Sequence, residues 1–427
     1  MSALFKVSLL HNKSKHMQFK DLKLNKPILK AISEKKYEVP TPIQEYTIPL
    51  ILDKKDVIAS AQTGTGKTGA FALPILQLLY DKQNEGKSGK KIRALIISPT
   101  RELAIQINDD FNKYSKYTNL KSAVVFGGAS IDPQKEILKK GIDILIATPG
   151  RLLDLHKQDL VNLSFIETLV LDEADLMLDM GFIDDVKKIE RLCPNQKQIL
   201  LFSATMPHKV VDLANSLLTE PEKVEISPTS STSKSVNQVL YYTPKPQKIE
   251  LCLHLLRNTI KGNILIFRRT KHGVDKLEKS LIKNGYEVSA IHGDKSQSER
   301  QEALNNFKKG VVSILIATDV ASRGIDIKEL DAVINFDIPN IPETYVHRIG
   351  RTGRAGNKGT SYSLCSADEK VYIATIQKLI NKFIPVEEEH PYPLDPKAKP
   401  QIHKKAGSKH KKGRKSEGSK KKKKRWY

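Results

Sequence analysis

The sequence predicts an α/β protein with two parallel sheets, each covered by helices, followed by a basic tail that does not fold. Short apolar runs alternate with helical patterns over most of the 427 residues, and this alternation occurs in two successive sets. The hydrophobic content of 39% is enough to form ordinary cores, and the length is typical of two or three domains. We therefore expect two α/β domains in tandem.

Each set of apolar runs predicts the strands of one sheet. In the first set, strands are expected at Asp56–Ala59, Ala94–Ser98, Ser122–Phe126, Asp143–Ala147, Thr168–Leu171 and Gln198–Phe202. The second set begins near Gln238 and continues with Asn263–Phe267, Val288–Ile291, Ser313–Ala317 and Ala332–Asn335. Because helical patterns separate these runs, the strands of each sheet are expected to be parallel.

The segment between the two sets marks the domain boundary. It is rich in Ser, Thr and Pro, a composition typical of a flexible linker. After residue 386 the periodic pattern stops, and prolines lead into Gly, Ser and Lys repeats that cannot bury enough surface to fold. The expected organisation is 17–226 for the first domain, 227–235 for the linker, 236–386 for the second domain and 387–427 for a disordered tail. Residues 1–16 match no later motif, and because Met17 directly precedes the first motif, we expect it to be the natural start.

The net charge of +23 indicates a polyanionic partner, either nucleic acid or an anionic membrane surface. From residue 397 to the end there are 15 basic residues and one acid, so this tail carries +14 and the rest of the chain +9. The run Lys420–Arg425 would offer charge to phosphates, and Trp426 and Tyr427 would offer aromatic faces to bases. A solubilising or ribosome-associated extension is the alternative interpretation.

Cysteine usage and hydropathy indicate the compartment. Cys193, Cys252 and Cys365 are too far apart for a local metal-ligand pair, and they form no disulfide-like pattern. No apolar stretch approaches the length of a membrane span, and the apolar segment near the N-terminus lacks a basic leader. We expect reduced core cysteines in a soluble, cytoplasmic protein that is not secreted.

A glycine-rich loop between a predicted strand and a predicted helix indicates a nucleoside triphosphate site. Its glycines would let successive backbone N–H groups face phosphate oxygens, and the following helix would add its positive end. Lys67 would reach the β- and γ-phosphates, and Thr68 would hold Mg²⁺ through its hydroxyl. A plain glycine-rich turn is the alternative, and Ala61 stands where the usual pattern begins with glycine. The loop consists of Ala61, Gln62, Thr63, Gly64, Thr65, Gly66, Lys67 and Thr68.

An acidic cluster, Asp172-Glu173-Ala174-Asp175, follows an apolar strand about a hundred residues later. Alone, such a cluster is usually a solvated loop, but with the phosphate loop it describes a site that binds and hydrolyses a triphosphate. Asp172 would face Mg²⁺ through water, and Glu173 would orient and deprotonate the attacking water. Asp175 is expected to pair within the protein.

Four further segments complete a motif set that resembles that of the DEAD-box RNA helicases. They are Pro40-Thr41-Pro42-Ile43-Gln44, Pro99-Thr100-Arg101-Glu102-Leu103-Ala104, Ser203-Ala204-Thr205 and His347-Arg348-Ile349-Gly350-Arg351-Thr352-Gly353-Arg354. The motifs occur in the family's order, and the resemblance covers about residues 19–376. The short basic tail is most similar to the bacterial RhlE-type branch. The resemblance implies two tandem RecA-like domains of the P-loop NTPase type. One departure is Lys36 before Tyr37, where the family usually has glycine.

The resemblance implies roles for residues around ATP. Gln44 would read the adenine edge, Phe19 would stack on the base, and Asp326 would hold the ribose hydroxyls. Arg351 and Arg354 match the arginine fingers that the second domain brings to the γ-phosphate. The implied cofactors are therefore ATP and Mg²⁺.

The resemblance also implies coupling and RNA-binding residues. Asp175, Ser203, Thr205 and His347 would couple the acidic cluster to domain closure. Because backbone amides, hydroxyls and arginines suit a phosphate track, RNA binding independent of base sequence is expected, with the Arg151 helix as a wedge that bends one strand. The implied RNA-binding residues are Pro99, Thr100, Arg101, Gly127, Gly128, Thr148, Pro149, Gly150, Arg151, Arg268, Gln297, Arg300 and Thr318.

These expectations combine into one predicted function. The chain would couple RNA-stimulated ATP hydrolysis to domain closure, and so unwind short RNA duplexes or remodel RNA–protein complexes. Alternatives are an ATP-gated RNA clamp, an RNA chaperone acting through the tail, or a DNA-translocating helicase, against which Gln44 and the acidic tetrapeptide argue. Candidate assemblies are ribosomal precursors and RNA-decay complexes, and the sequence does not indicate an oligomeric state.

Overall fold

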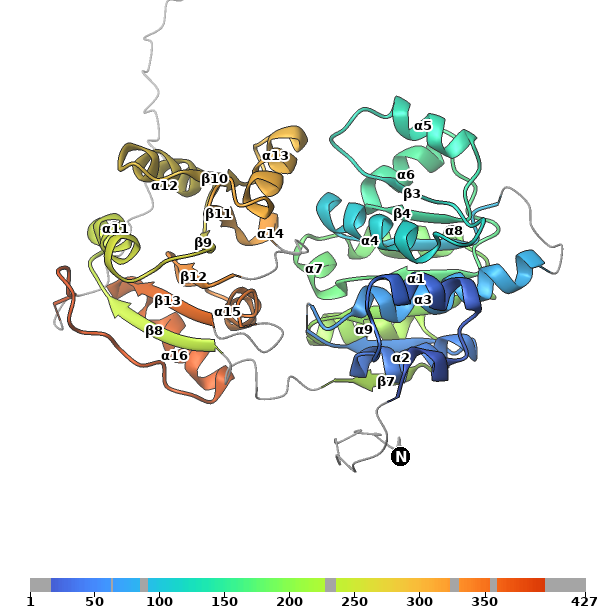
Figure 1. Ribbon diagram of the computed structural model, residues 1–427, viewed down its shortest axis with the longest axis horizontal. Helices are drawn as coiled ribbons and strands as arrows, with labels where there is room; N and C mark the ends of the chain where they lie inside the picture. Colours follow the sequence, from blue (N-terminus) through green and yellow to red (C-terminus); the bar gives the residue numbers. More distant parts are fainter. Residues whose placement is uncertain are drawn as a thin grey trace, which may run out of the picture.

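The chain forms two α/β units, each built on a parallel sheet, that lie side by side (Figure 1). The computed structural model describes residues 17–62, 64–84, 91–226, 236–322, 330–353 and 359–395. The predicted linker, residues 227–235, lies outside the described residues. The α/β class with two parallel sheets is confirmed.

The first sheet has seven strands within the described residues, in the order β3-β4-β2-β5-β6-β1-β7, all parallel. Its central strands are buried on both faces, which is why they are continuous apolar runs rather than alternating ones. The strands are β1 (Val57–Ser60), β2 (Ala94–Ile97), β3 (Ser122–Val125), β4 (Ile144–Ala147), β5 (Thr168–Leu171), β6 (Gln198–Ser203) and β7 (Glu222–Glu225).

Helices cover both faces of this sheet. They are η1 (Phe19–Leu22), α1 (Lys26–Glu34), α2 (Pro42–Leu52), α3 (Lys67–Asn84), α4 (Arg101–Tyr114), α5 (Asp132–Lys139), α6 (Pro149–Lys157), α7 (Ala174–Asp179), α8 (Ile183–Leu192) and α9 (His208–Leu217). The first residues of α4 and α6 belong to predicted motifs, and these residues favour the start of a helix. Thr100 caps α4 by accepting a hydrogen bond from the Leu103 amide, and Pro149 stands in the first turn of α6, where its missing N–H costs nothing.

The second sheet has six parallel strands within the described residues, in the order β10-β11-β9-β12-β13-β8. The strands are β8 (Val236–Tyr242), β9 (Ile264–Arg268), β10 (Val288–Ile291), β11 (Ile314–Thr318), β12 (Ala332–Asn335) and β13 (Gly359–Cys365). The helices are η2 (Lys245–Gln247), α11 (Lys248–Asn258), α12 (Lys271–Lys283), α13 (Gln297–Lys308), α14 (Asp319–Ser322), α15 (Pro342–Ile349), η3 (Ala367–Glu369) and α16 (Lys370–Ile380). α13 and α14 lie on the side towards the first domain, and α11 and α12 lie away from it (Figure 1).

Two strands were not predicted from the sequence. β7 is an edge strand whose only buried residue is Val224, so it has no apolar run. β13 alternates small polar residues with larger ones, and its buried Ser361 and Ser363 are satisfied by the side chain of Asn335 on the neighbouring strand. Both strands are therefore specified by their neighbours rather than by local hydrophobicity.

The cores occupy both faces of each sheet, and all three cysteines lie in them. Burial raises the pKa of Cys193, Cys252 and Cys365 to about 12, so these thiols stay protonated and inert. This confirms the expectation of reduced core cysteines. Across the described parts of the chain, no helix combines the length and the apolar character needed to cross a membrane.

The predicted start of the tail at residue 387 is wrong, because the chain remains packed up to residue 394. Leu240 on β8 pairs with Val386 in a parallel bridge, and the Leu394 amide donates to the Tyr242 carbonyl at 3.0 Å. The ring of His390 lies edge-on to that of Tyr241, with centroids 5.5 Å apart. This strap, residues 385–394, covers the free edge of β8. Composition alone does not show that this edge strand requires a cover. The rest of the predicted tail, 396–427, lies outside the described residues.

We therefore expect the effect of truncation to depend on whether the chain is cut after the strap or before it. A chain that ends after Asp395 should unfold at the same temperature as the full chain. A chain that ends after Ile384 should lose about 2–4 kcal/mol of unfolding free energy in the second domain, because the backbone hydrogen bonds to β8 and the aromatic packing are lost. Differential scanning calorimetry of the three chains measures this, and equal melting of both truncated chains would contradict it.

The residue that departs from the family pattern, Lys36, adopts a left-handed backbone with φ of 57°. Glycine adopts this conformation without the penalty of about 1 kcal/mol that a side chain imposes. Lys36→Gly is therefore expected to raise the unfolding free energy of the first domain by about 0.5–1 kcal/mol. Thermal unfolding measures the change, with Lys55→Gly, at an exposed position without a positive φ, as the control that should not stabilise.

Candidate functional site

The predicted site motifs lie where strands end, and because each sheet is parallel, these ends share one edge. In the first domain, β1 leads into the phosphate loop, β5 into the acidic cluster and β6 into Ser203–Thr205. In the second domain, Arg268 ends β9 and Thr318 ends β11. Topology therefore collects residues that are far apart in the sequence.

The phosphate loop has the backbone that its glycines predict. Gly64 and Gly66 have φ of 86° and 91°, a region that other residues rarely adopt. A Cβ on Gly66 would also lie 2.6 Å from the side-chain nitrogen of Gln44, so the position has no room for another residue. Thr63 lies outside the described residues.

Gln44, in the first turn of α2, is buried against the phosphate loop. Its Nε2 donates to the Gly66 carbonyl at 3.1 Å, and its Oε1 accepts a hydrogen bond from the Thr41 amide at 3.0 Å. Gln44 thus links the start of α2 to the loop. Phe19 is buried in the adjoining core. Adenine reading by Gln44 and stacking by Phe19 stay predictions.

Lys67 and Glu173 form a buried ion pair at the centre of the site, with Nζ and Oε1 2.9 Å apart. Burial alone would lower the pKa of Lys67, but the carboxylates of Glu173, Asp172 and Asp175 outweigh it, so its pKa is raised and the amine stays charged. Glu173 has a φ of 54°, a strained backbone for a residue with a side chain. The residues predicted to hold phosphate and to activate water are therefore in direct contact.

Asp172 is suited to a cation. It is 2% exposed, and its Oδ1 accepts no hydrogen bond from the described residues. Burial first, and then the neighbouring Glu173, raises the pKa of Asp172 from 3.8 to about 7. A cation would satisfy the unpaired oxygen and favour the charged form. The carboxylate of Asp172 and the hydroxyl of Thr68 are the hard oxygen ligands that Mg²⁺ prefers, so the residues fit this ion.

The raised pKa makes stability depend on pH. Between pH 3.8 and about 7 the unfolded chain loses the Asp172 proton while the folded chain keeps it, so stability falls as pH rises through this range. Asp172→Asn removes this cost of about 1.4 kcal/mol per pH unit. We expect the variant to be more stable than the unchanged protein by a few kcal/mol at pH 8 and by less at pH 5. Calorimetry without nucleotide and with chelator measures this, and an equal gain at both pH values would contradict it.

Asp175 joins the end of β5 to the end of β6. Its Oδ2 accepts from the Thr205 amide at 2.9 Å and from the Thr205 hydroxyl at 2.8 Å, and the Asp175 amide donates to the Ser203 hydroxyl at 3.2 Å. Burial would raise the pKa of Asp175, but Lys67, His347 and these hydroxyls outweigh it, so its pKa is lowered. Because Lys67 belongs to the first domain and His347 lies on α15 of the second, charged groups of both domains contribute to the lowered pKa of Asp175.

The second-domain motif contains a buried arginine that sequence reasoning missed. The guanidinium of Arg348 binds both oxygens of Asp319, at 2.6 and 2.7 Å, and donates to the Asp337 carbonyl at 2.6 Å. It also lies over the Phe267 ring, 4.9 Å from the centroid. Arg348 therefore joins α15 to the ends of β11 and β12. Arg351, which follows Arg348 in the same motif, is also buried. The predicted Arg354 and Asp326 lie outside the described residues.

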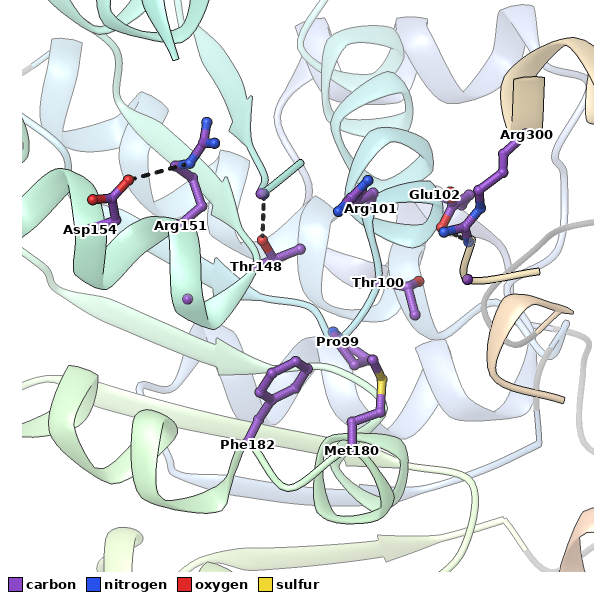
Figure 2. A pocket seen from close by; sticks show the side chains of 13 residues that line it. Pro99, Thr100, Arg101, Glu102, Thr148, Arg151, Asp154, Met180, Phe182 and Arg300 are labelled. Carbon is purple, nitrogen blue, oxygen red and sulfur yellow. Dashed lines mark hydrogen bonds and ion pairs between the residues drawn. The ribbon is translucent and has the colours of Figure 1, made fainter. Parts of the chain in front are cut away.

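A cavity of about 540 Å³ gathers predicted RNA-binding residues from both domains (Figure 2). It includes five residues that the sequence did not single out for RNA, namely Glu102, Asp154, Met180, Phe182 and Gly293. Gly128, Pro149, Arg268, Gln297 and Thr318 do not line it. The predicted residues that do are Pro99, Thr100, Arg101, Gly127, Thr148, Gly150, Arg151 and Arg300.

Unsatisfied donors in this cavity suit phosphate. Arg151 donates to the Ala129 carbonyl at 3.0 Å, but its Nη1 is buried without a hydrogen-bond partner among the described residues. The same holds for Nε of Arg300. Both guanidinium groups line the cavity and are positively charged, so an anion that enters the cavity would be attracted to them.

Glu102 bridges the two domains at the cavity wall. Its carboxylate binds Arg300 at 3.0 Å and accepts a hydrogen bond from Gln297 Nε2 at 3.2 Å, while Arg101 donates to Gln297 Oε1 at 3.3 Å. Figure 2 shows Arg300 reaching Glu102 from the second domain. Glu102 was quoted within a motif but given no role, because its partners are about 200 residues away in the sequence.

Comparison with known proteins identifies the family. A family model described as DEAD/DEAH box helicase matches residues 41–213, and one described as helicase conserved C-terminal domain matches residues 247–356. The chain belongs to the DEAD-box helicases. These matches contain the phosphate loop, the acidic cluster and the arginine-rich motif of this DEAD-box protein.

Named relatives and solved structures agree. The DEAD-box ATP-dependent RNA helicase RhpA of Helicobacter pylori is 43% identical over 86% of this chain and 73% of its own length. The ATP-dependent RNA helicase RhlB of Shewanella woodyi is 41% identical over 94% and 92%. The structure of S. cerevisiae Dbp5 bound to RNA and ADP BeF3 has a TM-score of 0.76 at 30% identity, covering 87% of this chain and 95% of that one. Mss116p bound to ssRNA and AMP-PNP has a TM-score of 0.81 at 30% identity, covering 89% and 81%. The RhlE-type branch stays a prediction.

Proposed function

We propose that this DEAD-box protein closes its two domains over ATP and an RNA strand, and so unwinds short RNA duplexes or remodels RNA–protein complexes. Membership of the family supports the coarser activity, an RNA-dependent ATPase and helicase. One observation carries the finer proposal. The cavity with unsatisfied arginines is lined from both domains, and Glu102 already joins them at its wall.

In the nucleotide site, each residue has a proposed task. Lys67 would leave Glu173 to hold the ATP phosphates, and Glu173, once free, would accept the proton of the attacking water. Thr68 and Asp172 would hold Mg²⁺, which supplies positive charge beside the phosphates. Arg351 would add charge from the second domain, so hydrolysis would require closure.

On the RNA side, recognition would be by phosphate. The cavity offers guanidinium groups, the Thr148 hydroxyl and glycine backbone, none of which distinguishes one base from another. The hydroxyl of Thr148 already accepts a hydrogen bond from the Gly127 amide at 3.4 Å, which places that loop beside α6. Closure of the domains on a strand held here would bend it, and a bent strand cannot stay in a regular duplex.

The test compares phosphate release and strand separation with RNA and with DNA. We expect RNA to stimulate hydrolysis, DNA of the same length not to, and a short RNA duplex to separate faster than one several times longer. A rate of phosphate release that is indifferent to RNA would refute the proposal. Strand annealing is measured for the Glu173→Gln variant and for the chain that ends after Asp395. If the variant promotes annealing and the truncated chain does not, an RNA chaperone that acts through the tail is the better explanation.

A further inference from the structure

The outer face of α12 carries an unbroken basic stripe. His272, Lys276, Lys279 and Lys283 are all exposed, and their spacing of four, three and four residues places them within about 60° of one another around the helix. The opposite side of α12 packs into the core through Val274, Leu277 and Leu281. The stripe therefore faces solvent over about 16 Å of helix.

The acids of α12 do not neutralise this stripe. Asp275 accepts from His292 at 2.8 Å, and Glu278 binds Lys295 at 3.2 Å. Both carboxylates are turned towards the loop between β10 and α13, and around the helix Asp275 and Glu278 lie about 40° and about 100° from Lys279, the nearest residue of the stripe. Apart from Lys271, which binds Asp294 at 2.7 Å, the basic residues of this helix lie on its outer face and its acids lie at the flank.

The lysines of the stripe also differ from those surface lysines of this protein that hold ion pairs. Lys116, Lys188 and Lys245 each bind a carboxylate within 3.2 Å. For Lys276, Lys279 and Lys283, the part of the chain that the structure describes holds no ion-pair partner. Three uncompensated charges on one face repel one another, so an anion that bound them would relieve this repulsion.

The stripe begins beside Arg268, a residue predicted from the sequence to bind RNA that does not line the cavity. Arg268, at the end of β9, packs on the first turn of α12 so closely that a Cβ on Gly273 would lie 2.7 Å from its guanidinium. His272, the first member of the stripe, is adjacent to that contact. At the other end of α12, Arg257 of α11 donates to Asn284 at 3.0 Å and extends the basic surface. Figure 1 shows both helices on the side of the second sheet away from the first domain.

We propose that the outer face of α12 binds the phosphate backbone of RNA that continues beyond the interdomain cavity. The inference rests on the proposed function and adds to it a second, charge-only contact that holds flanking RNA. Charge complementarity and the position of Arg268 beside the first turn of α12 favour RNA over an acidic protein surface. Because lysines without aromatic neighbours read no bases, this contact is independent of sequence.

The test uses the full chain with Lys276, Lys279 and Lys283 all changed to Gln. The control changes Lys54, Lys55 and Lys223 to Gln, which removes equal charge from exposed positions in the turn before β1 and on edge strand β7. Binding is measured against salt with one RNA of about 30 nucleotides and one of about 6, which is within the range of single-strand sites. Thermal unfolding confirms that both variants fold.

For the long RNA, the α12 variant is expected to bind about tenfold more weakly at low salt, with a salt slope smaller by about 2, since each lost phosphate contact removes about 0.7. Its binding of the short RNA, and the ATP hydrolysis that the short RNA stimulates, should match those of the control. Unchanged long-RNA affinity, or an equal loss in the control, would overturn the proposal and leave an acidic protein as the partner of this face. Absence of stimulation in the unchanged protein would instead refute the proposed function.

Discussion

The Glu173→Gln variant is expected to hydrolyse ATP about 10³-fold more slowly than the unchanged protein while binding it at least as tightly. The loss of rate follows from the loss of the proposed general base, which typically contributes 10²–10⁴-fold. The retained binding follows from the ion pair. Lys67 is held by Glu173 at 2.9 Å in the free site, and ATP must draw it away. A neutral glutamine holds the amine less strongly, so more of the Lys67 charge is available to phosphate.

Two measurements separate these effects: the Kd of a fluorescent ATP analogue and single-turnover phosphate release with saturating RNA. Glu190→Gln is a matched control, because Glu190 also pairs with a lysine, Lys197 at 2.7 Å, but lies outside the site. It should leave both quantities unchanged. Lys67→Ala should abolish turnover by loss of binding, the opposite pattern. Turnover by Glu173→Gln within tenfold of normal would show that another group activates the water.

Much of the nucleotide site could be predicted because its constraints are local. The left-handed Gly64 and Gly66 are required by the loop itself, and an apolar strand that ends in carboxylates needs no distant partner to be recognised. Strands such as Thr168–Leu171 were predicted to the residue because they are buried on both faces.

What could not be predicted depends on contacts between distant segments. The role of Glu102 requires Gln297 and Arg300 of the other domain, and that of the strap requires the open edge of β8. Short, polar segments such as β7 and the strap have no periodic signal of their own, since their backbone partners rather than their side chains fix them. Eight residues that line the cavity were predicted one by one, but Glu102, Asp154, Met180, Phe182 and Gly293 and the position of the cavity between the domains were visible only in the fold.

Arg348→Ala is expected to lower the unfolding free energy of the second domain by about 3–5 kcal/mol. Arg348 is 2% exposed, so its removal leaves the charge of Asp319 partly buried without its bidentate partner, and opens a cavity against Phe267. Arg348→Lys should recover only part of the loss, because one ammonium cannot reproduce the planar fork that binds both oxygens. RNA-stimulated hydrolysis should also fall, since His347 and Arg351 flank this residue in the chain.

A double-mutant cycle with Asp319→Asn distinguishes the ion pair from simple packing. If the pair holds α15 to α14, the double variant should be more stable than the sum of the single losses predicts, because removing the charge of Asp319 also removes the penalty of leaving it unpaired. Calorimetry of the four proteins gives the coupling free energy. Strictly additive losses would mean that Arg348 stabilises the domain through its contacts with Phe267 and the Asp337 carbonyl instead. Its effect on hydrolysis would then come from the packing that supports His347 and Arg351.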